Sequence, residues 1–60
     1  MKTVFKCDNV EEDYIEVIKR PGQIKLEVVN GVTENWVFLS EKNAKKLAKT
    51  INKMLGRNEK

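Results

Sequence analysis

The 60-residue sequence has no histidine, a single cysteine and a single proline. Without histidine there is no Ser-His-Asp or Cys-His arrangement, and a zinc site of the His/Cys type is excluded. P-loop, GxGxxG and HExxH motifs are also absent. We therefore expect a protein that is not an enzyme, with no catalytic residues, no cofactor and no metal site.

Cys7 is that single cysteine, so a disulfide within the chain is impossible and a reducing compartment is favoured. No apolar run approaches the roughly 18 residues that span a bilayer, and the N-terminus has no signal-peptide core. These absences predict a cytoplasmic protein without a membrane partner. The length predicts one domain, residues 1–60, near the lower limit for folding alone, and a homodimer would relieve that limit.

Charge is abundant but unevenly distributed. Residues 1–39 contain five Lys/Arg and seven Asp/Glu, whereas residues 40–60 contain seven and two, which together give the net charge of +3. The positive charge therefore belongs to the C-terminal segment.

The segment 41–55 is predicted to form an amphipathic helix, followed by a frayed tail at 57–60. Ser40 is placed to act as the N-cap, and Gly56 suits the left-handed position that follows a helix. The apolar residues recur at the helical period, on one side: Ala44, Leu47, Ala48, Ile51, Met54 and Leu55.

Strands rich in β-branched residues are expected before this helix, at about residues 2–7, 13–20, 23–29 and 32–39. Pro21-Gly22 predicts a tight turn that pairs Val17 with Leu26. The predicted fold is α+β, an antiparallel sheet of three to four strands with one C-terminal amphipathic helix packed on one face.

Asn30-Gly31 predicts a second hairpin, with two possible registers. A two-residue turn pairs Val29 with Val32 and places Trp36 and Phe38 on the mixed, partly charged face of the sheet. A three-residue turn with a glycine bulge instead places both aromatic residues on the apolar face. The need for a core favours the second register.

Two surfaces are candidates for binding a partner. The first is a row of lysines on the helix, a candidate polyanion site: Lys42, Lys45, Lys46, Lys49 and Lys53. A solvated helix face is the commoner account of such a row. The second is a candidate protein interface: Tyr14, Ile18, Val29, Trp36 and Val37. A homodimer would hide four of these residues on the second sheet face: Tyr14, Ile18, Val29 and Val37.

Two clusters of acidic residues could suggest catalysis or metal binding, but the sequence favours neither. Glu16 and Glu27 become cross-strand neighbours in the predicted register, but no nucleophile accompanies them. The connector around residues 8–13 lacks the spacing of a calcium loop, and a solvated loop is the favoured account.

Three resemblances accompany these features. Trp36 to Glu41, running into the helix, resembles the last strand and helix of the positive-coactivator family, which implies a dimer that binds single-stranded DNA. Ser40 to Lys45 resembles the last-helix entry of double-stranded-RNA-binding domains, which implies phosphate contacts by Lys42 and Lys45. Leu39 to Ala48 is similar to the helix entry of short phage- and prophage-encoded proteins, which implies binding to a macromolecule.

These features lead to one expectation and one alternative. We expect a non-enzymatic interaction module that binds a macromolecule as a homodimer. The alternative is a nucleic-acid-binding protein that uses the lysine row.

Overall fold

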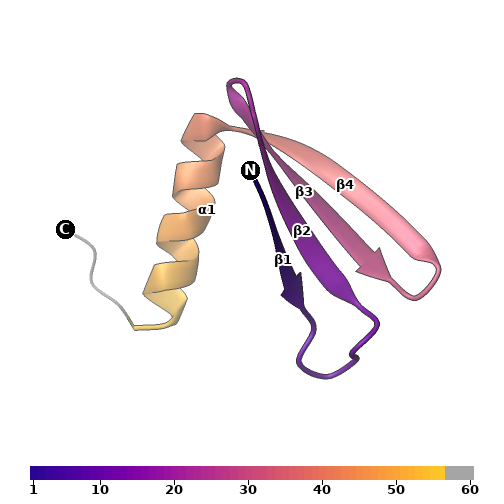
Figure 1. Ribbon diagram of the computed structural model, residues 1–60. Coiled ribbons are helices and arrows are strands. Elements are labelled where there is room, and N and C mark those ends of the chain that lie inside the picture. Colours follow the sequence, from indigo (N-terminus) through magenta and orange to yellow (C-terminus); the bar gives the residue numbers. More distant parts are fainter. Residues whose placement is uncertain (57–60) are drawn as a thin grey trace.

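Four strands follow one another along the chain and pair in the same order, so every connection joins neighbours in the sheet. The computed structural model describes residues 1–56. The strands are β1 (Lys2–Lys6), β2 (Tyr14–Arg20), β3 (Gln23–Asn30) and β4 (Thr33–Ser40), all antiparallel, and α1 (Glu41–Met54) follows them (Figure 1). The predicted α+β fold is confirmed. The tail predicted to fray, residues 57–60, lies outside the described residues.

The β2–β3 hairpin has the predicted register. Arg20 pairs with Gln23 across Pro21-Gly22, and Val17 lies opposite Leu26. Proline fixes φ at the first turn position, and Gly22 takes a φ of 72° at the second, where a side chain would be strained.

The register favoured for the second hairpin is wrong. Asn30 pairs with Thr33, so Gly31-Val32 form a two-residue loop, one position later than the two-residue turn considered from the sequence. Gly31 has a φ of 62°, and glycine at the first loop position suits the primed turns that match strand twist. Its N–H also donates to Asp13 Oδ1 at 2.8 Å, a contact 18 residues away in sequence. Trp36 therefore lies on the mixed face.

The sheet has one apolar face and one mixed face, because directly opposed residues share a side and successive residues alternate. The apolar face carries Thr3, Phe5, Ile15, Val17, Ile24, Leu26, Val28, Val37 and Leu39, and also the polar residues Lys19, Asn30, Thr33 and Asn35. The mixed face carries Lys2, Val4, Lys6, Tyr14, Glu16, Ile18, Arg20, Lys25, Glu27, Val29, Glu34, Trp36 and Phe38.

Helix α1 starts directly at the end of β4. Ser40, which is extended at φ −62° and ψ 162°, accepts a hydrogen bond from the Asn43 N–H at 3.1 Å, so the last strand residue is also the N-cap. Glu41 stands in the first turn, where the helix dipole favours a negative charge. At the other end, Gly56 has a φ of 77° and donates to the Lys53 carbonyl.

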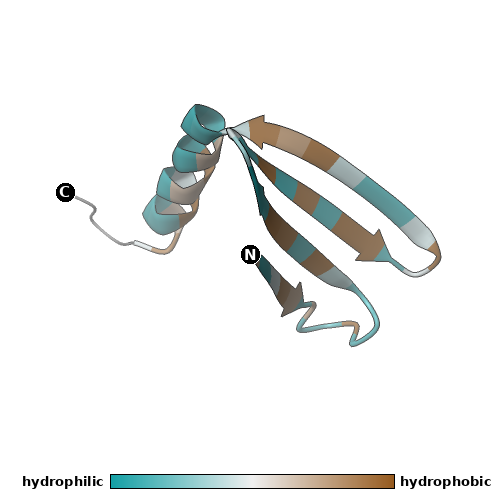
Figure 2. Cartoon of the chain, turned by 45° about the horizontal axis from the view of Figure 1, so that its top comes forward, coloured by the Kyte–Doolittle hydropathy of each residue, from teal (hydrophilic) through white to brown (hydrophobic). Residues whose placement is uncertain are grey.

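The helix packs on the sheet only near this junction. Among the described elements it contacts β3 and β4, and it diverges from the strands toward its C-terminus (Figure 1). Lys19, on the apolar-face side of β2, forms a 3.1 Å ion pair with Glu41 at the junction. The hydrophobic side of α1 is turned toward the sheet (Figure 2). We call this side of α1, together with the apolar face of the sheet, the inner side.

No residue of the described chain is buried. Contact of the whole apolar helix side with the sheet was expected, but Met54 is 80% exposed and Leu55 is also open to solvent. No helix among residues 1–56 is long and apolar enough to cross a membrane.

Candidate interaction surfaces

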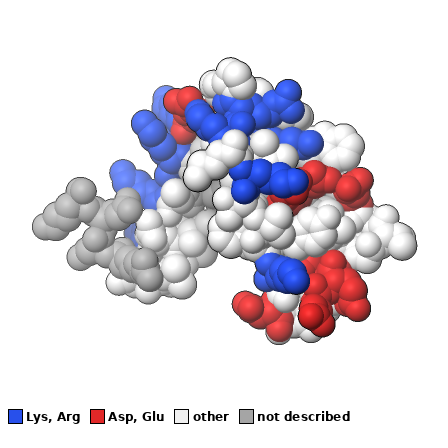
Figure 3. Space-filling model, viewed as in Figure 1, with Lys and Arg blue, Asp and Glu red and all other residues white. Residues whose placement is uncertain are grey.

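The lysine row forms one continuous surface on α1. Its five residues lie within a narrow arc of the helix, on the side opposite Leu47 and Ile51, and all five are exposed. None of them forms an ion pair with a described residue. Figure 3 shows basic residues over α1 and the upper end of the sheet, with acidic residues gathered at the lower end. We call this surface the lysine face.

One acidic residue lies beside the lysine face. The Lys19 hydrogen bond and charge hold the pKa of Glu41 below its usual value, and Lys45 adds to this effect. Glu41 is therefore engaged mainly with the sheet, so it does not neutralise the row.

The mixed face exposes two aromatic side chains with cations above them. Trp36 is 54% exposed, and Lys25 Nζ lies 5.5 Å from the centre of its ring. Phe38 is 46% exposed, and the Arg20 guanidinium lies 5.8 Å from its ring centre. The expectation that Phe38 and Trp36 lie in the core was wrong, because the observed pairing of β3 with β4 places both rings on the mixed face.

The predicted protein-interface residues do not all share this face. Tyr14, Ile18, Val29 and Trp36 lie on the mixed face, whereas Val37 lies on the apolar face opposite Leu26. Tyr14 pairs with Val29, in the cross-strand row next to that of Trp36 and two strands away from it. The set is therefore a scattered surface and not one compact patch.

Glu16 and Glu27 are direct cross-strand neighbours, as predicted. Each is paired with a lysine, Glu16 with Lys2 at 3.2 Å and Glu27 with Lys25 at 3.8 Å. Each carboxylate therefore faces an ammonium group, so positive and negative charges lie close together on the mixed face.

The acidic connector between β1 and β2 is folded onto the end of the sheet. The Cys7 N–H donates to the Asp13 carbonyl, and Cys7 Sγ accepts from the N–H groups of Asn9 and Val10 at 3.4 and 3.3 Å. Through the bond from Gly31 to Asp13, this connector is tied to the β3–β4 turn at the same end of the sheet. Sequence reasoning missed this role of Asp13, because nothing local marks a contact with a turn 18 residues away.

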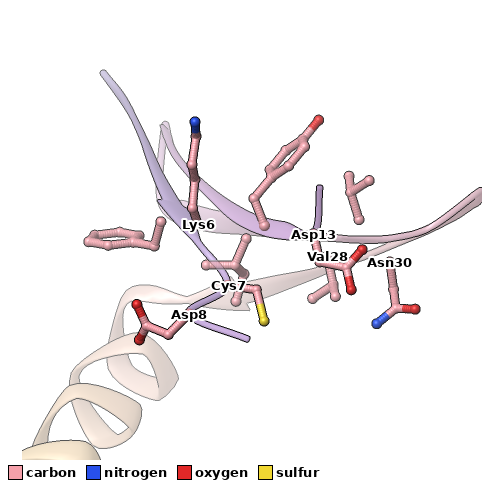
Figure 4. Close-up of a pocket in the computed structure, with 10 residues that line it drawn as sticks. Lys6, Cys7, Asp8, Asp13, Val28 and Asn30 are labelled. Atoms are coloured by element: carbon pink, nitrogen blue, oxygen red, sulfur yellow. The ribbon is translucent and has the colours of Figure 1, made fainter. Parts of the chain in front are cut away.

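An open hollow of about 360 Å³ lies beside this connector. Cys7, Asp13 and Val28 are among the residues that line it (Figure 4). No group of three or more Cys, Asp or Glu side chains among residues 1–56 is arranged to hold a metal ion. The hollow is lined by the ends of β1, β2 and β3 and by the connector.

The inner side carries seven of the exposed large hydrophobic residues: Phe5, Val28, Val37, Leu47, Ile51, Met54 and Leu55. Phe5 is 56% exposed and Val37 is 54% exposed. Val28 and Ile51 are also exposed, each on an inner-facing side of its element. Exposed apolar surface of this extent in a small chain marks a contact surface for another molecule.

The chain therefore has three surfaces able to receive a partner: the lysine face, the mixed face and the inner side. Comparison of the chain with protein families, with curated proteins and with solved structures gives no match.

Proposed function

We propose that the protein is a small non-enzymatic interaction module of the cytoplasm that binds a macromolecule and acts as a homodimer. The exposed aromatic pair of the mixed face supports this function best. Trp36 and Phe38 lie two residues apart on the edge strand β4, each with a cation over its ring. Aromatic and arginine side chains dominate binding hot spots, and a rigid sheet presents them at little entropic cost.

The surrounding charges suit a protein partner. The ion pairs of Glu16 and Glu27 with their lysines place positive and negative charges close together on this face. Mixed charges of this kind give orientation and specificity in a protein interface, whereas a phosphate backbone is repelled by the carboxylates.

Trp36→Ala tests this proposal. Tagged wild-type protein and the variant are used to capture partners from a cytoplasmic extract, and captured proteins are identified by mass spectrometry. The protein captured by wild type is expected to be lost by Trp36→Ala and retained by Val32→Ala, which removes an exposed turn side chain of no proposed role. A partner that Trp36→Ala retains in full would contradict the mixed face as the binding surface.

The lysine face supports a second candidate function, binding of nucleic acid or another polyanion. Its five lysines share one side of α1 without an ion-pair partner among the described residues. Each phosphate neutralised by a lysine releases counterions, so affinity falls with salt by a slope of roughly 0.9 per contact on duplex DNA.

Titration of labelled single-stranded and double-stranded nucleic acid at two salt concentrations tests this candidate. Lys46→Glu is expected to weaken binding and to lower the salt slope, whereas Lys6→Glu, on β1, is the matched control. Binding that is absent at low salt, or equally weakened by both variants, would rule out the lysine face as the site.

A further inference from the structure

The described chain lacks a core of its own. Every side chain on the inner side stays at least partly exposed, and none is excluded from solvent in the way that a folded interior requires. Hydrophobic burial is the main favourable term in folding, and in this chain much of it is left unrealised. A stable fold therefore needs something permanent on the inner side.

The solvent-exposed area of the chain can be compared with the area expected for a compact folded monomer. A folded monomer of 7.0 kDa is expected to expose about 4,000 Å². This chain exposes 5328 Å², which is roughly 1,300 Å² more than that expectation. Its radius of gyration is 12.8 Å, against about 10 Å for a compact domain of this length. This excess belongs to the surface of the whole chain, and it is larger than the roughly 800 Å² that each partner contributes to a standard interface. The exposed large hydrophobic residues of the inner side are part of that surface.

We propose that a second copy of the chain covers the inner side, so that two sheets and two α1 helices enclose one shared apolar core. The inference deepens the homodimer of the proposed function and rests on it in that respect. It assigns the contact to the inner side and leaves the mixed face and the lysine face on the outside of the dimer.

The chemistry of the surfaces favours this occupant. The middle of the inner side presents mainly aliphatic and aromatic groups, with polar residues such as Lys19 and Asn35 toward its margins. A partner of the same character is required, and the inner side of another copy meets that requirement by symmetry. A second copy is also present whenever the chain is made, as a permanent core demands. A permanent apolar core suits the mixed face less, because it would take the ion pairs of Glu16 and Glu27 fully out of water, whereas a partner of the mixed face can meet them with its own charges.

Folding and association are then one process. The monomer keeps too little buried area to stay folded, so stability depends on the concentration of chains. Raising that concentration tenfold is expected to move the urea midpoint upward by on the order of 0.5–1 M.

Neighbouring residues of β4 provide a matched pair of variants. Val37 and Trp36 are both 54% exposed, but Val37 lies on the inner side and Trp36 on the mixed face. Light scattering should give twice the chain mass for wild type and for Trp36→Lys, whereas Val37→Lys should shift to single chains or unfold. Loss of the dimer by Trp36→Lys together with its retention by Val37→Lys would overturn the proposal.

A measurement on the wild-type protein removes the dependence on variants. In a sample mixed from isotope-labelled and unlabelled chains, nuclear Overhauser effects between chains are expected from Phe5 and Val37 to Ile51 or Met54. Effects between chains that involve Trp36 and Phe38 instead would overturn the proposal, as would a single-chain mass with a midpoint independent of concentration. A monomer that still captures a partner through Trp36 would overturn this inference alone, and a dimer that binds no macromolecule would overturn only the proposed binding function.

Discussion

Replacing Ser40 with alanine should weaken helix α1 measurably without touching any apolar contact. The Ser40 hydroxyl accepts the Asn43 N–H at 3.1 Å, and alanine leaves that donor to water. Helix α1 has no buried residue, so its own end contacts supply a larger share of its stability than in a helix set into a core.

The expected loss is about 0.5–1 kcal/mol, because N-cap substitutions typically cost about 1 kcal/mol and this bond is solvent-exposed. Urea slopes for small domains are close to 1 kcal/mol per molar, so the midpoint should fall by roughly 0.5–1 M.

Urea unfolding followed by circular dichroism, at one fixed chain concentration, measures this change. Ser40→Asp keeps an acceptor and adds a favourable charge at the helix N-terminus, so it should hold the wild-type midpoint or exceed it. Asn43→Ala keeps the donor, since the bond uses the main-chain N–H, and should lower the midpoint less than Ser40→Ala. A Ser40→Ala midpoint equal to that of wild type would refute the reasoning.

Three further changes should be detectable by simple measurements. Gly31→Ala is expected to lower stability by about 1 kcal/mol in urea unfolding, because alanine is strained at a φ of 62°, whereas Val32→Ala should be silent. Asp13→Ala should lower it by a similar amount, about 1 kcal/mol, by leaving the Gly31 N–H without its acceptor, while Asp13→Asn should retain part of the bond. Lys19 lowers the pKa of Glu41 in the folded protein, so this pair adds stability above the ordinary glutamate pKa and loses it as the pH falls through the lowered folded value. Carbon-detected NMR titration should show the Glu41 pKa rising toward its usual value in Lys19→Met, with the smaller lowering by Lys45 retained.

Local signals in the sequence were sufficient for much of this architecture. The helical period placed the apolar residues and the lysines of α1 on opposite sides, and Ser40 and Gly56 occupy its ends as expected. Pro21-Gly22 favours a two-residue turn, and this turn pairs Arg20 with Gln23 and so determines the register of β2 and β3.

The register predicted for the second hairpin was wrong for a non-local reason. The sequence offered two registers, and the choice assumed that the chain must bury Trp36 and Phe38 by itself. The structure places them outside, with the turn held by Asp13 from another part of the chain. Val37 was consequently assigned to the wrong face, since a shift of one residue exchanges the two faces of a strand.

Periodicity also does not fix how closely two elements approach. It identified the inward side of α1 but not the divergence of the helix from the sheet, which depends on the few contacts that α1 makes with β3 and β4. The candidate lysine face could therefore be predicted residue by residue, whereas the extent of the exposed inner side could not.

Because α1 follows β4 without a loop, the connection fixes how the helix is rotated about its own axis relative to the sheet. Ser40 belongs to both elements, so no loop residue exists to absorb a change in length. One residue inserted after Ser40 would turn the helix by about 100° about its axis, since an α-helix has about 3.6 residues per turn. Such a turn would carry Ile51 away from the sheet and swing the lysines toward it. The number of residues at this junction thus determines which side of α1 faces the sheet and which side faces solvent.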